Sequence, residues 1–208
     1  MAPTLFYSPG ACSLAPHVVL QWIGEPYEAV RVKIGSPELL KINPSGAVPA
    51  LDTGEGWTLT QNAAILQYIA RRYPAAKLGA TDDLHDQAEM ERWLAYFTGD
   101  LHPAFFPVFM TPRYTTSRDA KALEDVKDAG LDLVRKRLDV LNAHLAGKNY
   151  IVGNRRTIAD AYALPMLRWA VAKLPEGLAK HPNVQALLDR LTSDPVVQAV
   201  IKSEETSG

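Results

Sequence analysis

Residues 4–24 of the chain, TLFYSPGACSLAPHVVLQWIG, predict a strand, a turn and a helix in direct succession. The run Thr4–Tyr7 is rich in side chains that favour strands, and a Pro-Gly pair ends it. Apolar residues then recur at helical spacing until Gly24, which suits a helix end. The only cysteine of the chain, Cys12, therefore falls at a strand-to-helix corner, just before the first helical turn.

Short β-like runs and one more helix follow this unit. Residues Tyr27–Val32, Val48–Leu51 and Trp57–Leu59 predict strands, and residues 61–73 predict a helix. A helix between the first two strands favours parallel pairing, whereas the short Gly-rich turn before the last strand favours an antiparallel hairpin. We therefore expect an α/β domain with a mixed four-stranded sheet over residues 1–77.

Beyond a turn-prone link at residues 74–83, the chain shows only helical patterns. Thr157 and Asp160 have the spacing of an acidic variant of the capping box, which predicts a helix start. Asp194 followed by proline predicts the start of a last helix. We expect an all-helical domain over residues 84–208, in which the final seven residues form a polar tail.

Composition excludes several classes of function. The 208 residues carry a formal net charge of −1 and no basic run, which argues against a nucleic-acid partner. We find neither a secretory signal nor an apolar run of membrane-spanning length. A single cysteine cannot form an internal disulfide, which favours a reducing cytoplasm. The five histidines lack metal-ligand spacing with one another or with Cys12, so we expect no metal site.

Four segments in a fixed order carry a resemblance to a known family. They are SPGACSLAPH (8–17), NPSGAVPAL (43–51), LTQNAAI (59–65) and TIADAY (157–162). Over essentially its whole length the chain resembles the glutathione transferases, specifically the bacterial cysteine-containing beta class. The resemblance implies a thioredoxin-like N-terminal domain, a helical C-terminal domain, a homodimer, glutathione as co-substrate, and a role in detoxification.

Cys12 is the first candidate catalytic residue. Lowering the pKa of a free thiol from about 8.5 to about 6.5 requires roughly 2.7 kcal/mol. A helix N-terminus supplies up to ~2 kcal/mol, so further donors are needed, and the Ser13 hydroxyl is one candidate. Two ordinary alternatives are that Cys12 is a small buried apolar residue and that Ser13 only caps the helix. The resemblance implies that Cys12 lies beside the glutathione sulfur and forms a mixed disulfide with it.

Two further segments match the glutathione site of the family. The resemblance implies a cis peptide bond between Val48 and Pro49, which presents the Val48 backbone to the cysteinyl part of glutathione. Gln61 and Asn62 open a predicted helix whose N-terminus suits the γ-glutamyl carboxylate, although both could simply cap it. Beta-class proteins usually have an acidic residue in place of Gln61 and a small one in place of Asn62.

Three polar residues are also assigned by the resemblance. Asp100 matches an acidic residue that reaches the γ-glutamyl amine from the partner subunit. His102 matches a histidine that faces the sulfur, where a neutral imidazole can hydrogen-bond a thiolate, although it could be only a helix-end histidine. Residues 33–42 form a shorter segment than in relatives, and Lys33 or Lys41 is the nearest candidate for the glycyl carboxylate.

Aromatic residues of the helical part predict the wall of a second, apolar substrate pocket, and we select Phe106 and Trp169. The preferred function is transfer of the glutathione thiol to a hydrophobic electrophile. One alternative is monothiol, glutathione-dependent thiol–disulfide exchange through Cys12. Another is a non-catalytic binding protein on the same scaffold.

Overall fold

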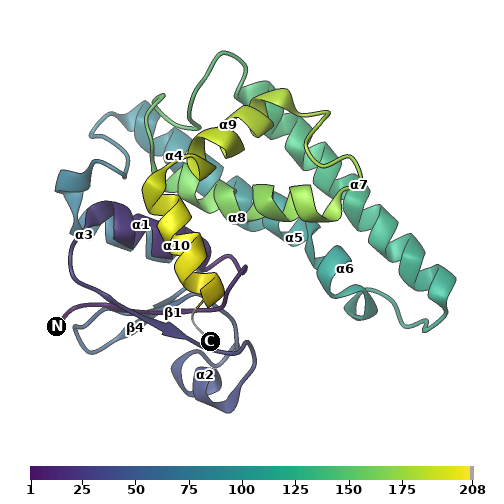
Figure 1. Ribbon diagram of the computed structural model, residues 1–208, viewed down its shortest axis with the longest axis horizontal. Helices are drawn as coiled ribbons and strands as arrows, with labels where there is room; N and C mark the ends of the chain where they lie inside the picture. The colour runs from purple at the N-terminus through teal and green to yellow at the C-terminus, as the bar shows by residue number, and fades with distance from the viewer. Residues whose placement is uncertain (207–208) are drawn as a thin grey trace.

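The computed structural model describes residues 1–206. Its four strands, β1 (Thr4–Tyr7), β2 (Glu28–Arg31), β3 (Ala50–Asp52) and β4 (Thr58–Thr60), form one sheet in the order β2-β1-β3-β4. The pairing of β1 with β2 is parallel, and the other two pairings are antiparallel. The prediction of a mixed four-stranded sheet is therefore confirmed. Figure 1 shows this sheet at one end of the molecule, beneath α1 and α10.

Three helices belong to the sheet-containing part: α1 (Leu14–Ile23), α2 (Pro37–Ile42) and α3 (Asn62–Arg72). Helices α1 and α3 pack against each other, whereas α2 lies at the far side of the sheet (Figure 1). The sequence analysis did not predict α2. Its local signal is a capping serine followed by proline: the Ser36 side chain accepts a hydrogen bond from the backbone N–H of Leu39, and Pro37 is the first helical residue.

The rest of the described chain is helical, and all strands assigned within residues 1–206 precede Gln61. The main helices are α4 (Leu84–Tyr96), α7 (Ala120–His144), α8 (Ile158–Lys173), α9 (Pro182–Thr192) and α10 (Pro195–Thr206). Shorter pieces join them: η1 (Pro74–Ala76), the π-helical turn η2 (Phe97–Leu101), α5 (His102–Ala104), α6 (Phe106–Phe109) and η3 (Thr111–Arg113). No helix in the described part of the chain is long and apolar enough to cross a membrane.

The expected polar tail is only partly correct. Residues 202–206 belong to α10, and the side chain of Glu204 is buried, with 2% of its surface exposed. Apolar residues Val197 and Val200 also face inward, so α10 docks as an amphipathic helix and packs against α1. The remaining tail positions, 207 and 208, lie outside the described residues.

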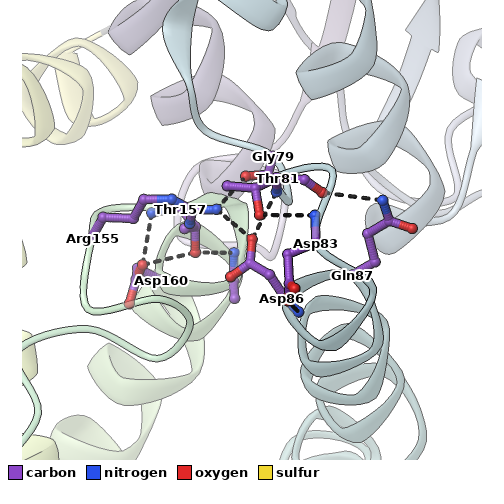
Figure 2. A network of polar contacts seen from close by, with 9 residues as sticks. Gly79, Thr81, Asp83, Asp86, Gln87, Arg155, Thr157 and Asp160 are labelled. Carbon is purple, nitrogen blue, oxygen red and sulfur yellow. Dashed lines mark hydrogen bonds and ion pairs between the residues drawn. The ribbon is translucent and has the colours of Figure 1, made fainter.

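The link between the two parts is held by a polar network that Figure 2 shows. Asp86 accepts hydrogen bonds from the backbone N–H of Thr81 and from Nη2 of Arg155, both at 2.7 Å. The same Nη2 also donates to the carbonyl of Gly79 at 3.0 Å. Arg155 precedes α8 in sequence, so this network fixes the link relative to the start of the most buried helix.

Helix α8 starts with the predicted capping box. The Thr157 side chain accepts from the N–H of Ala159, and the Asp160 carboxylate accepts from the N–H of Thr157 at 2.8 Å (Figure 2). Asp160 also accepts from the N–H of Ile151. Burial outweighs these hydrogen bonds and raises the pKa of Asp160 to about 6. The helix continues through Pro165, and nearly its whole length lies in the core.

Candidate functional site

Cys12 sits where the sequence places it, between the end of β1 and the start of α1. The turn before it closes with a hydrogen bond from the N–H of Ala11 to the carbonyl of Ser8, and Gly10 adopts a φ of +73°, which favours glycine. Only 8% of Cys12 is exposed. Its Sγ lies 3.3 Å from the carbonyl oxygen of Val48, to which the thiol donates.

The Cys12 sulfur is therefore held as a protonated thiol. Burial raises the pKa of Cys12 to about 12, and the backbone N–H groups of Cys12 and Ser13 oppose this rise only in part. A thiolate would also face the Val48 carbonyl oxygen, which is an acceptor. The N-terminus of α1 therefore does not lower the pKa of Cys12 overall, because desolvation of the thiol outweighs the effect of the backbone N–H groups.

The alternative in which Ser13 only caps the helix is wrong, because its side chain makes no capping hydrogen bond. Its hydroxyl instead donates to the carbonyl of Ser8 at 3.2 Å and accepts from the N–H of the same residue at 3.1 Å. The hydroxyl is fully buried in this turn. Ser13 consequently favours the charged form of Cys12 through its backbone N–H rather than through its side chain.

The Val48-Pro49 peptide bond is cis, as predicted. Val48 and Pro49 are both buried, and Val48 follows Gly46, which has a φ of +65° and packs against Gly35 and Leu40. The strand predicted to begin at Val48 starts two residues later, at Ala50. This loop places the Val48 carbonyl against the sulfur of Cys12.

Gln61 and Asn62 form the N-terminus of α3, but they play different parts. Gln61 is exposed, has a φ of +71°, and makes no side-chain capping bond, so the alternative in which its side chain caps the helix is wrong. Asn62 is 6% exposed, and its Nδ2 donates to the carbonyl oxygen of Cys12 at 2.9 Å. Within residues 1–206 its Oδ1 has no hydrogen-bond partner, which costs about 1–3 kcal/mol for a buried polar atom.

His102 begins the short helix α5 after the π-helical turn. Its Nδ1 lies 3.3 Å from the hydroxyl of Tyr162, and its ring is 5.1 Å from the ring centroid of Trp169. Burial lowers the pKa of His102 to about 4, so the imidazole is neutral near pH 7. The structure therefore supports a neutral hydrogen-bonding group at this position and not a cation.

The aromatic residues that we predict as a pocket wall cluster around His102, and we call this cluster the aromatic wall. Phe106 lies 5.1 Å from its ring in edge contact, and Trp169 contacts the rings of Phe105 and Phe109 at 5.4 and 5.2 Å. The indole N–H of Trp169 donates to the carbonyl of Gly10 at 2.8 Å. This bond ties the wall to the turn that carries Cys12.

The structure brings Asp100 and Lys33 into different surroundings. Asp100 forms an ion pair with Arg137 of the same chain at 3.1 Å, and both side chains are more than a third exposed. Lys33 is exposed in the loop after β2, and its side chain makes no ion pair within the described part of the chain.

Sequence reasoning missed two features of the site. Tyr162 belongs to the TIADAY segment, and its hydroxyl neighbours His102; burial, with a smaller contribution from Cys12, raises the pKa of Tyr162 to about 12. The bond between Asn62 and Cys12 was also missed. The only local signal for it is that an amide stands at this helix start.

Two hollows lie outside this site. One, of about 600 Å³, is bounded by Trp57, Leu59, Tyr68 and Arg72, and the other, of about 770 Å³, lies between α3, the interdomain link and α4. Neither is lined by Cys12 or by the aromatic wall. Within residues 1–206, no group of three or more His, Cys, Asp or Glu side chains is placed to hold a metal ion.

Comparisons with known proteins agree with this geometry. Residues 1–71 match the family "Glutathione S-transferase, N-terminal domain", and residues 86–195 match "Glutathione S-transferase, C-terminal domain". Glutathione S-transferase GST-4.5 of Xanthomonas campestris is 41% identical over 203 residues, which are 96% of this chain and 98% of that protein.

Solved structures give the same result. A bacterial beta class glutathione S-transferase of Sphingomonas chungbukensis is 35% identical, with a TM-score of 0.85 over 97% of this chain and 98% of that one. A sphingomonad glutathione S-transferase complexed with glutathione is also 35% identical, with a TM-score of 0.86 over 98% of this chain and all of that chain.

Proposed function

Because this chain belongs to the glutathione S-transferase family, we propose that it joins the thiol of glutathione to a small hydrophobic electrophile at the Cys12 turn. The observation that carries the proposal is the contact between the Cys12 sulfur and the Val48 carbonyl. This contact puts a thiol and the Val48 backbone at one point, where a cysteine-containing tripeptide can pair with both.

Each end of glutathione has a candidate partner. Val48 pairs with the cysteinyl backbone as in one rung of an antiparallel ladder, once the Cys12 thiol has released its carbonyl. The N-terminus of α3, where Gln61 is exposed, receives the γ-glutamyl carboxylate. Lys33 is exposed and free of ion pairs within residues 1–206, and we assign it to the glycyl carboxylate.

The state of Cys12 decides which sulfur is the nucleophile. Because burial keeps Cys12 protonated, its S–H acts as a hydrogen-bond donor that stabilises the glutathione thiolate. The thiol proton of glutathione passes to solvent, its sulfur attacks the electrophilic carbon, and the leaving group departs. Neutral His102, held by Tyr162, is a second group that we place beside the sulfur. Phe106 and Trp169 orient the apolar substrate.

Thiol–disulfide exchange is the second candidate function. The backbone N–H groups of Cys12 and Ser13 favour the thiolate form of Cys12, which is the form that attacks a disulfide. The two functions are separated by measuring three quantities on one preparation: affinity for glutathione, conjugation of an aryl halide, and reduction of a small disulfide by glutathione. We expect binding with conjugation. Binding with disulfide reduction alone overturns our proposal in favour of exchange, and failure to bind glutathione favours a non-catalytic role.

We further propose that the chain works as a homodimer in the cytoplasm, on substrates that need detoxification. The hollow beside Trp57, which is 46% exposed, offers a second copy a surface that combines the Trp57 ring with the charged side chains of Glu55 and Arg71. Analytical ultracentrifugation tests this, since a variant with Trp57→Glu is expected to sediment as a monomer. A wild-type monomer at micromolar concentration would contradict the dimer.

A further inference from the structure

Asn62 links the start of α3 to the turn before α1 that carries Cys12. It is the first residue of α3, yet its Nδ2 reaches the carbonyl oxygen of Cys12 at 2.9 Å. Both partners are buried, so water does not compete for this hydrogen bond. The bond connects the proposed γ-glutamyl end of the site to the backbone of the reactive turn.

The carbonyl of Cys12 does not need Asn62 as a partner. That oxygen already accepts a hydrogen bond from the N–H of Ala15 at 3.1 Å, three residues further on, whereas Pro16 has no N–H to make the α-helical bond. The amide of Asn62 meanwhile leaves its own Oδ1 without a partner among the described residues. A small side chain would avoid that orphan atom, so packing alone gives no reason for asparagine here.

The geometry of the peptide bond supplies a reason. The Cys12 carbonyl and the Ser13 N–H belong to one planar group, so a hydrogen bond that holds the oxygen also fixes the direction of the N–H. The Ser13 N–H is one of the two donors that favour the charged form of the Cys12 sulfur. A hydrogen bond accepted at the carbonyl also polarises the N–H at the other end of the group.

We propose that Asn62 is a positioning residue for Cys12, which holds the Cys12–Ser13 peptide so that its N–H stays directed at the sulfur. Asn62 thereby sets how readily that sulfur reacts or stabilises a neighbouring thiolate. The inference rests on the proposed function only for the identity of the bound thiol, because the hydrogen bond joins two groups of the protein itself.

The test uses the one cysteine of the chain and no glutathione. In the reaction with 4,4′-dithiodipyridine, the Cys12 thiolate attacks one sulfur, the disulfide breaks, and a mixed disulfide forms while 4-thiopyridone leaves. Its absorbance gives the rate constant at pH 7 to 10. For Asn62→Ser we expect about a 3- to 10-fold slower reaction throughout, with the rise in rate displaced to higher pH.

A purely structural role for Asn62 predicts the opposite sign. Loosening the packing around the buried thiol would expose it and make the reaction faster, so an equal or faster rate in Asn62→Ser overturns the proposal. Asn183→Ser is the matched control, because Asn183 makes the same kind of bond from Nδ2 to the carbonyl of Asn142 at 2.9 Å. That variant is expected to react at the wild-type rate.

Asn62→Asp provides a second measurement if Asn62→Ser does not fold. The carboxylate keeps the shape of the amide but cannot donate to the Cys12 carbonyl when ionised, so the reaction must again be slower than in the wild type. A wild-type rate in Asn62→Asp also overturns the inference. If the wild type does not conjugate an aryl halide, only the proposed function is contradicted, and the positioning role of Asn62 is unaffected.

Discussion

Nδ1 of His17 lies 2.8 Å from Oε1 of Glu204, and this contact joins the first helix to the last one, 187 residues along the chain. Both side chains are buried. His17 stands one turn beyond Ser13, to whose carbonyl its N–H donates, so α10 is fixed to the helix that carries the reactive turn. At the other end of α10, Asp194 accepts from the indole N–H of Trp22 at 2.9 Å.

Replacing Glu204 with alanine should destabilise the fold strongly, because it leaves a buried imidazole without its partner. We expect the free energy of unfolding to fall by about 1–3 kcal/mol in urea titrations. The double variant His17→Phe with Glu204→Leu should recover most of this loss. A change in the free energy of unfolding of less than ~1 kcal/mol in Glu204→Ala would show that the His17–Glu204 contact does not stabilise the fold.

Cys12→Ala should abolish every mixed disulfide with glutathione, which intact-mass spectrometry detects directly. We expect aryl halide conjugation to fall by roughly 10- to 100-fold, the loss of one hydrogen bond to a charged sulfur. Cys12→Ser keeps a donor and should retain more activity than Cys12→Ala. Equal activity in the two variants would contradict the donor role that we assign to this thiol.

The stability of the protein should depend on pH through His102. Its pKa is about 4 in the folded chain and near 6.5 when unfolded, so the unfolded chain binds more protons between these values. The free energy of unfolding must therefore decrease as the pH falls from about 6.5 to about 4. His102→Phe should flatten this part of the curve, which urea unfolding at pH 5 and 7 measures. If the pH dependence of the free energy of unfolding is the same in His102→Phe and in the wild type, groups other than His102 cause it.

Arg155→Ala should loosen the interdomain link. The variant loses the bonds to Asp86 and to the Gly79 carbonyl, and we expect about 2 kcal/mol lower stability with faster proteolysis at residues 74–83. Lys121→Ala is the control, because its pair with Asp125 is exposed and worth less than ~0.5 kcal/mol. Similar losses in the two variants would argue against a special role for the network.

Local patterns were enough for several elements. The predicted strand Thr4–Tyr7 and a helix from Leu14 to Ile23 match β1 and α1, because alternation, helical spacing and a terminal glycine all act over neighbouring residues. The capping box at Thr157 was equally local. Helix α2 was missed because six residues are too few to show a helical period, although Ser36 and Pro37 marked its start.

The site was harder to predict than the fold. Proline has no N–H for a ladder, which is one reason why β3 begins after the cis bond at Pro49 and not at Val48. The position of Ser13 is typical of a helix cap, but its hydroxyl instead hydrogen-bonds the backbone N–H and carbonyl of Ser8 in the preceding turn. Asn62 looked like a ligand or a cap, and its contact with Cys12 depends on how α1 and α3 pack.

The order of strands and helices, the strand-to-helix corner at Cys12 and the helix start at Thr157 followed from the sequence by itself, since each depends on propensities and periods within a few residues. Only the tertiary structure decided that the sulfur is buried against Val48, that His102 is neutral, and that Glu204 is an inner residue. Those properties are set by desolvation and by partners brought together from distant segments, which no local pattern records.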